Sequence, residues 1–283
     1  MSILPQVTLV TTFKPQTGVF QYLQENALCS WLALKPQPEV LIVGESAGVD
    51  RLAKKYGVRY IRNVRTTPSG VPLVNDIFNL AIKQGKYDLI CYLNGDMVLG
   101  QDFLVTLGHV DARTDDYLLL GRRLDVDIPA PVGQAMLTSP ESLCRLAASY
   151  GRLHSYDGID YFVFRRNFWD NIPDLAIART RWDNWMIHNA LSRGKKVVDC
   201  TRGIKAIHQN HDYSSIPGGL DGKIFLREAG ANEKITANAF ASIVDANYLF
   251  FAGICWRLPN IIVHLRKQLW YYTKILQSFS ARK

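Results

Sequence analysis

Asp88-Leu-Ile-Cys-Tyr-Leu-Asn-Gly-Asp-Met-Val-Leu99 is the stretch that decides the fold of this chain. Its first half carries one charge in six residues, as expected for a strand buried on both faces of a sheet. The strand runs into Asn94-Gly95-Asp96, followed by a second apolar patch. A carboxylate where a buried strand emerges is well placed to hold a hard divalent cation. The same three residue types also close strands as simple turns, so both interpretations stay open at this point.

Strand and helix patterns alternate on both sides of this stretch. Apolar or β-branched runs predict strands at Val7–Phe13, Val40–Val43, Val58–Val64, Tyr117–Leu120, Tyr161–Arg165 and Val197–Asp199. Helical spacing of apolar residues predicts helices at Phe20–Leu34, Val49–Tyr56, Pro72–Gly85, Ser142–Tyr150 and Trp182–Leu191. Ile128–Pro140 is rich in proline and is predicted to be a loop. Strands and helices that alternate through short links are typical of a parallel, three-layer α/β sheet.

Composition excludes several classes of protein. The 283 residues are 48% hydrophobic and 20% charged, which is neither disordered nor fibrous. A net charge of +8 favours anionic partners in general, but no basic and aromatic groove pattern points to nucleic acid. No run reaches the roughly 18 apolar residues that a membrane-spanning helix needs. Five widely spaced cysteines and the lack of a signal-peptide pattern predict free thiols in a cytoplasmic protein.

Polar residues at the carboxyl ends of the predicted strands are the candidate ligand contacts, because open α/β sheets bind ligands there. They are Thr11, Thr12 and Lys14 after the first strand, then Glu45, Arg65, Thr67, Asn94, Gly95 and Asp96. The chain lacks Gly-x-Gly-x-x-Gly after its first strand and lacks Gly-x-x-x-x-Gly-Lys-Ser/Thr. A dinucleotide-binding Rossmann enzyme and a P-loop ATPase are therefore disfavoured.

In the order and position of these residues the chain resembles the GT-A glycosyltransferases over roughly residues 7 to 213. The resemblance rests on the Val7–Phe13 strand, on Glu45, and on Asn94-Gly95-Asp96 at the place of the family's Asp-x-Asp motif. It implies a GT-A type three-layer α/β/α sandwich with a mostly parallel, Rossmann-like sheet. It also implies that Asp96 binds Mn2+ or Mg2+, with Asn94 replacing the family's first aspartate.

The same resemblance assigns the nucleotide contacts. Thr11, Thr12, Phe13 and Glu45 match base and ribose contacts, and Arg65 would lie close to the nucleotide. The positive charges of Arg179 and Arg181 could neutralise a diphosphate leaving group.

Two later clusters supply the remaining candidates. Inverting members of the family use a carboxylate at the start of a late helix as general base, and Asp183 holds that place, with Asp160 as its rival. An aspartate there also caps helices, so that interpretation stays beside the catalytic one. A late histidine in many of these enzymes contacts the metal or diphosphate, and both His208 and His211 match its place, with His211 preferred.

The C-terminal segment is predicted to be a basic, amphipathic helical extension, residues 241–283, beyond a catalytic domain of residues 1–240. Its apolar stripe consists of Ile261, Leu265, Leu269, Tyr272, Leu276 and Phe279, and Arg266, Lys267 and Lys274 lie opposite. Such a stripe packs on its own domain, on a second subunit to give an oligomer, or on an anionic membrane surface. The last case predicts a peripheral protein on the cytosolic membrane face.

The function that the resemblance implies is a metal-dependent, inverting glycosyltransferase of the hexosyltransferase type. Its partners would be a nucleotide-diphosphate sugar, with UDP favoured, and a glycan or lipid-linked acceptor. One alternative is a sugar-phosphate nucleotidyltransferase, although residues 11–16 lack the Gly-rich, Arg-containing loop that it needs. The other is a non-catalytic nucleotide- or carbohydrate-binding module.

Overall fold

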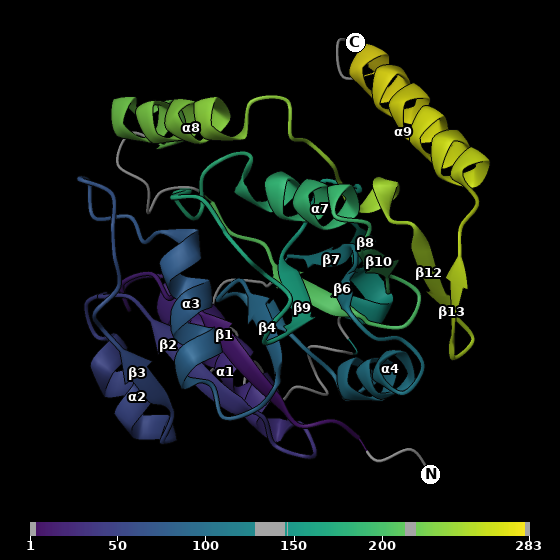
Figure 1. Ribbon diagram of the computed structural model, residues 1–283. Coiled ribbons are helices and arrows are strands. Elements are labelled where there is room, and N and C mark those ends of the chain that lie inside the picture. The colour runs from purple at the N-terminus through teal and green to yellow at the C-terminus, as the bar shows by residue number, and fades with distance from the viewer. Residues whose placement is uncertain (1–3, 128–144, 146, 213–218, 281–283) are drawn as a thin grey trace.

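The computed structural model describes residues 4–127, 145, 147–212 and 219–280. Its main sheet contains β1 (Val7–Thr11), β2 (Glu39–Val43), β3 (Arg59–Ile61), β4 (Leu89–Leu93), β6 (Tyr117–Leu120), β9 (Tyr161–Arg165), β10 (Lys196–Asp199), β12 (Tyr248–Phe251) and β13 (Ile254–Arg257). The order is β13-β12-β10-β6-β9-β4-β1-β2-β3 (Figure 1). Among these strands β9 and β13 run antiparallel to their neighbours and the other pairs are parallel, which confirms the mostly parallel sheet.

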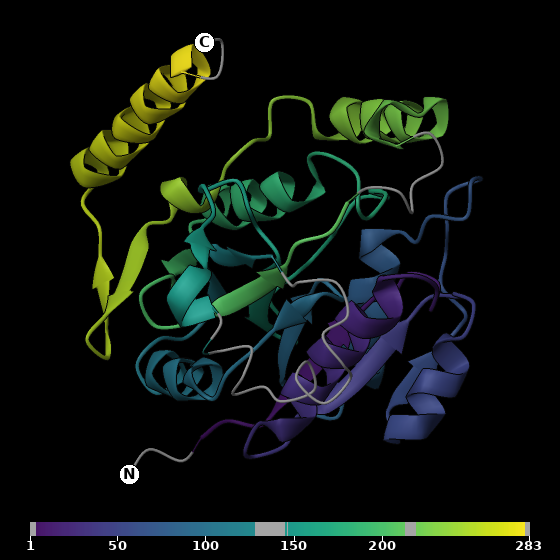
Figure 2. The same ribbon diagram turned by 180° about the vertical axis from the view of Figure 1, so that it is seen from behind.

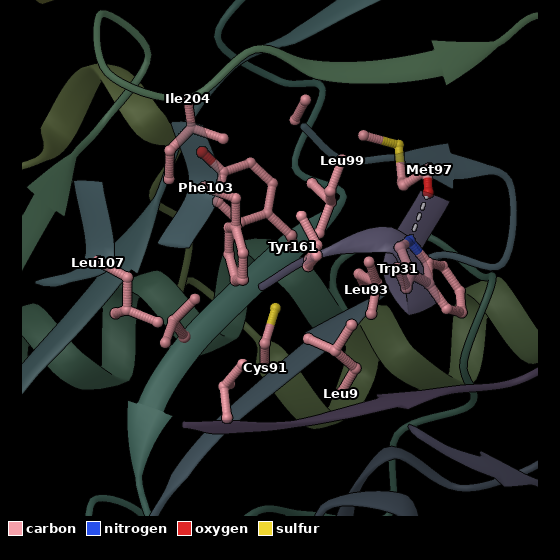
Figure 3. Close-up of a cluster of buried hydrophobic side chains, with 14 of the residues drawn as sticks. Leu9, Trp31, Cys91, Leu93, Met97, Leu99, Phe103, Leu107, Tyr161 and Ile204 are labelled. Atoms are coloured by element: carbon pink, nitrogen blue, oxygen red, sulfur yellow. Dashed lines mark hydrogen bonds between the residues drawn. The ribbon is translucent and has the colours of Figure 1, made fainter. Parts of the chain in front are cut away.

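Helices cover both faces of this sheet, so the predicted three-layer α/β/α architecture is confirmed. On one face lie α1 (Phe20–Ala33), α2 (Val49–Tyr56) and α4 (Asp102–Asp111), and on the other lie α3 (Val74–Gln84) and α7 (Trp182–Ser192). Figure 3 shows the first core, where Phe103 of α4 and Trp31 of α1 lie over Leu9, Cys91 and Leu93 of the sheet. The Trp31 indole N–H donates to the carbonyl of Met97 at 2.8 Å, which ties α1 to the turn after β4 (Figure 3).

The central strands are buried on both faces because their side chains alternate between the two cores. In β4, Cys91 and Leu93 belong to the core under α1 and α4, whereas Ile90 and Tyr92 belong to the core under α3 and α7. All five residues of β4 are buried. This is why the uncharged run before Asn94 is a reliable sign of a central strand.

A second, smaller sheet lies beyond the carboxyl end of β4. It consists of β5 (Met97–Val98), β11 (Ala206–Gln209), β7 (Arg123–Val126) and β8 (Arg152–Leu153), in the order β5-β11-β7-β8. β11 pairs antiparallel with β5 and parallel with β7. Sequence patterns do not predict this sheet, because its strands have two to four residues and mixed polarity.

The C-terminal segment differs from the helical extension predicted for residues 241–283. After α8 (Lys223–Thr236) and a short 3-10 turn at Ile243–Asp245, β12 pairs in parallel with β10 and so extends the main sheet. The helix α9 begins only at Asn260 and ends at Ser280, and both views show it at the edge of the molecule (Figures 1 and 2). The difference arises because the short apolar run of β12 has no periodicity that separates strand from helix.

The structure also bears on the predicted start of α3, on the proline-rich loop and on the cysteines. The helix predicted to start at Pro72 starts at Val74, because the Leu73 backbone is held extended by a bridge to Ala176. The loop predicted at Ile128–Pro140 and residues 142–144 and 146 of the predicted helix lie outside the described residues. Cys29, Cys91, Cys200 and Cys255 are free, and Cys144 lies outside the described residues. Within the described ranges, no helix has the length and apolar character to cross a membrane.

Candidate metal centre and active site

Asp96, His208 and His211 come together as a compact group of metal-ligating side chains. Both imidazole Nε2 atoms point to the same carboxylate oxygen, with Asp96 Oδ2 at 2.9 Å from His211 and 3.7 Å from His208. One ligand atom from each residue lies within 4.8 Å of the other two. The sequence could propose these residues only from their order in the chain, and the fold brings all three to one point.

The register of β11 produces this convergence. His208 lies opposite Met97 in the antiparallel ladder with β5, so it is next to Asp96. On its other side His208 lies opposite Asp125 in the parallel ladder with β7. The fully buried Gln209 donates to the backbone carbonyls of Asp96 (2.9 Å) and Leu23 (2.8 Å). This side chain therefore fixes the turn after β4 against β11 and α1.

The second nitrogen of each imidazole faces an acceptor. His211 Nδ1 lies 2.7 Å from the carbonyl oxygen of Asp212. His208 Nδ1 lies 3.1 Å from Asn210 Oδ1 and 3.5 Å from Asp125 Oδ1. With a metal bound, such contacts would favour the tautomer with the proton on Nδ1, which leaves the Nε2 lone pair for the metal. Asp125 is in turn bound by Arg123 and His154, so it is held in place behind His208.

The Asp96 carboxylate has an oxygen that is free to bind a metal ion. Its Oδ1 atom is buried and receives no hydrogen bond from any described residue. Burial raises the pKa of Asp96, but the hydrogen bond from His211 and the charges of His208, His211 and Lys14 outweigh it, so this pKa lies below its usual value. One carboxylate and two imidazoles fit a divalent cation, and the two nitrogen ligands suit Mn2+ or Zn2+ better than Mg2+.

Asp160 lies beside this group, but the guanidinium of Arg123 already neutralises its carboxylate. Its carboxylate accepts from Arg123 Nη1 at 2.8 and 2.9 Å and from Asn94 Nδ2 at 2.6 Å. The side chain is only 4% exposed. Asn94, predicted as a nucleotide contact, therefore uses its amide to orient Asp160, and its Oδ1 accepts from the Tyr92 hydroxyl at 3.1 Å.

Asp183 has a different environment. It lies in the first turn of α7, one residue inside the helix, and Oδ1 accepts from the Asn184 N–H at 2.9 Å. Burial raises the pKa of the Asp183 carboxyl to about 7, and the charge of nearby Asp160 contributes to the rise. Burial raises the pKa of the Tyr92 phenol, and the charges of Asp96, Asp160 and Asp183 raise it further, so all three carboxylates act on this one hydroxyl.

The carboxyl ends of β1 and β2 lie close to the turn that follows β4, at Asn94-Gly95-Asp96. A Cβ on Gly95 would lie 2.6 Å from the Phe13 ring and 2.9 Å from the Thr12 carbonyl, so only glycine permits this approach. The Ser46 hydroxyl, which follows Glu45, donates to the Phe13 carbonyl at 2.7 Å. Glu45 itself is exposed and Thr11 is fully buried. The predicted nucleotide roles of these residues stay predictions.

Two of the arginines predicted to contact the nucleotide, Arg65 and Arg179, form ion pairs with protein carboxylates outside the group of Asp96, His208 and His211. Arg65 pairs with Asp174 at 2.6 Å and is more than half exposed. Arg179 pairs with Glu228 of α8 at 2.7 Å and is largely buried. Their roles toward a nucleotide also stay predictions.

Three residues of the site are not singled out by any motif in the sequence. Asp125 and Arg123 lie on a short strand that alternates polar and apolar residues, and Gln209 lies between the two histidines. Alternation in Arg123-Leu-Asp-Val126 is the only local signal at these positions, and four residues are too few for it to predict a strand.

Comparison with known proteins shows only a weak structural similarity. No family model and no curated protein matches the chain. Among solved structures, the chain is similar to S. aureus TarS 1-349, at 16% identity and a TM-score of 0.42. The match covers 74% of this chain and 58% of that one. TarS 1-349 in complex with UDP-GlcNAc matches at 19% identity and a TM-score of 0.36, covering 57% and 46% of the two chains. Likeness at this level is no basis for a function, which has to come from the side chains of the site.

Proposed function

We propose that this protein is a metal-dependent glycosyltransferase that moves a sugar from a nucleotide diphosphate to an acceptor hydroxyl with inversion at the anomeric carbon. The observation that supports the proposal is that two imidazoles, His208 and His211, converge on the buried carboxylate of Asp96 at the end of β4. One oxygen of that carboxylate has no hydrogen-bond partner among the described residues. A second carboxylate with a pKa near 7 lies in the same acidic region.

Asp96, His208 and His211 would hold the cation, with Mn2+ preferred over Mg2+ because two of the three ligands are imidazoles. A divalent cation at this position neutralises charge on a diphosphate leaving group. Thr12 and Phe13 pack against Gly95 of this turn, so the carboxyl ends of β1 and β4 lie together, where open α/β sheets bind their ligands. UDP is the first nucleotide to test.

Asp183 is the proposed general base. One oxygen of the Asp183 carboxylate accepts the proton of the acceptor hydroxyl while the hydroxyl oxygen forms a bond to the anomeric carbon. The bond from the anomeric carbon to the diphosphate oxygen breaks, and the electron pair leaves with the nucleotide. Asp160 cannot compete easily for this role, because Arg123 and Asn94 already bind its carboxylate.

Isothermal titration of UDP and of GDP, each with and without Mn2+, tests the donor half of the proposal. We expect nucleotide binding that requires Mn2+ in the wild type and is lost in Asp96→Ala and in His208→Ala. His264→Ala removes an exposed histidine from α9 and serves as the control, which should bind as the wild type does. Equal Mn2+-dependent affinity in Asp96→Ala and wild type would reject the metal assignment.

The product tests the chemistry. A screen of UDP- and GDP-sugars for nucleotide release, followed by NMR of the transferred sugar, reports the anomeric configuration. We expect inversion. Retention would reject direct displacement with Asp183 as base. Release of pyrophosphate from a nucleoside triphosphate supplied together with a sugar 1-phosphate would indicate a nucleotidyltransferase instead.

A further inference from the structure

Helix α9 is attached to the domain by its polar face. Arg266 pairs with Asp199 and Lys267 with Asp245, each at 2.7 Å, and Lys274 pairs with Asp157. Trp270 is 7% exposed and donates from its indole to Ser155 Oγ at 2.8 Å. A helix that only covers a core buries its apolar face, so this orientation is the reverse of the usual one.

The apolar face of α9 is consequently turned to solvent. Eight large apolar side chains of the helix are between 40% and 68% exposed. They are Ile261, Ile262, Leu265, Leu269, Tyr271, Tyr272, Ile275 and Leu276. Half-exposed side chains in this number give on the order of 400 Å² of apolar surface, which is the size of the largest patch on a typical monomer, and such patches are often functional.

The spacing of part of this face also fits a coiled-coil seam with a second copy. Ile262, Leu265, Leu269, Tyr272 and Leu276 alternate at three and four residues. The positions beside such a seam include Gln268, Thr273 and Ile275, which cannot form interhelical ion pairs. A two-fold contact brings each patch against itself, so charges of one sign at its rim would repel.

Charge favours a lipid surface over that second copy. From Ala246 to Lys283 the chain contains six lysine and arginine residues and no aspartate or glutamate, and three of the six, Arg266, Lys267 and Lys274, pair with carboxylates of the domain. Arg257 ends β13, three residues before α9 begins, and is exposed, as is Arg202, which lies 5.1 Å from the Phe251 ring in the adjoining hairpin. Trp256 in that hairpin is 53% exposed, and indoles favour the membrane interface.

We propose that the exposed face of α9 docks on an anionic phospholipid surface, with the helix axis lying in the plane of the bilayer. The aliphatic side chains enter the boundary between headgroups and acyl chains, which is the binding mode of in-plane amphipathic helices. Basic residues at the rim add attraction to anionic lipid. The inference does not depend on the proposed glycosyltransferase activity.

Cosedimentation with phosphatidylcholine vesicles, with and without phosphatidylglycerol, tests this docking. The full chain should bind the vesicles that contain phosphatidylglycerol more tightly. Leu265→Ser/Leu269→Ser should lower the partition by about tenfold or more, because two leucines of the apolar face, 55% and 67% exposed, are lost. The matched control is Ile224→Ser/Leu226→Ser on α8, where the exposures are 47% and 55%.

The control variant should partition as the wild type does, and both variants should keep the wild-type melting temperature. Quenching of tryptophan fluorescence by brominated lipid should fall in Trp256→Phe. Wild-type protein that ignores both kinds of vesicle would overturn the proposal, as would equal loss in the α8 control. A dimer seen by light scattering that Leu265→Ser/Leu269→Ser dissociates, without vesicle binding, would assign the face to a second copy instead.

Discussion

Asp160 and Asp183 lie in one acidic region, but their neighbours give them different chemistry. The Arg123 guanidinium neutralises Asp160, and Asn94 fixes its orientation. No described residue forms an ion pair with Asp183, and burial holds its pKa at about 7. A carboxylate with that pKa is half deprotonated at neutral pH and accepts a proton more readily than an ordinary aspartate does.

Asp183→Asn should therefore lower turnover by roughly 10² or more while nucleotide affinity stays near the wild-type value. In the wild type, the rate at low substrate should rise with pH through about 7, since only the deprotonated Asp183 is a base. A pH series of initial rates measures this. If Asp160→Asn abolishes turnover and Asp183→Asn keeps it, the assignment of the base is wrong.

The same residue makes a stability prediction with a defined sign. The folded-state pKa of Asp183 is raised from 3.8, so the carboxyl favours folding below about pH 4 and that contribution is lost as pH rises through 7. The gain in stability from Asp183→Asn over the wild type should therefore be larger at pH 8 than at pH 5, by on the order of 2–3 kcal/mol. Urea unfolding at the two pH values measures the difference, and equal effects at both would contradict it.

Among the elements, β11 is the one that assembles the site, because it joins the turn after β4 to β7. Gln209 is the central contact, as it accepts from Asn26 at 2.9 Å and donates to the carbonyls of Leu23 and Asp96. Gln209→Ala should cost about 1–3 kcal/mol, since it leaves buried polar groups unpaired. It should also weaken Mn2+ binding, because Asp96 loses its backbone support.

Asn232→Ala is the matched control for that prediction. Asn232 is also a buried amide with three hydrogen bonds, two to Ala176 and one to Thr180, but it lies on α8. Urea unfolding should give the two variants similar losses, whereas calorimetry with Mn2+ should separate them. Loss of Mn2+ affinity in both variants would mean that general destabilisation, and not the β11 contact, is measured.

The elements also explain how far the sequence could predict this molecule. Val49–Tyr56, Tyr117–Leu120 and Tyr161–Arg165 are predicted with the bounds that the structure has, because glycine stops or uninterrupted apolar runs define them. The small sheet escapes prediction, since β7 and β11 pair across some eighty residues and their register has no local signature. The three metal candidates could be named from their order, but Asp125 and Gln209 could not, because only that register places them.

At the scale of the whole molecule, the C-terminal segment is an integral part of the main body. β12 extends the nine-stranded sheet, and α9 returns across the domain to contact β10 through Arg266 and Asp199. Asp199 is 2% exposed and also accepts from the Thr201 hydroxyl at 2.6 Å. The exposed apolar face of α9 is thus held in a fixed orientation by a buried ion pair.

The ion pairs of α9 should differ widely in their contribution to stability. Arg266→Ala leaves the buried Asp199 carboxylate without its cation, which typically costs about 3 kcal/mol or more. Lys274→Ala breaks a pair whose side chains are 42% and 39% exposed, and such pairs contribute about 1 kcal/mol or less. Urea unfolding of both variants measures the two losses. Equal losses would mean that the Arg266 pair is solvated in solution, and α9 would then not be held rigidly enough to present its apolar face in one direction.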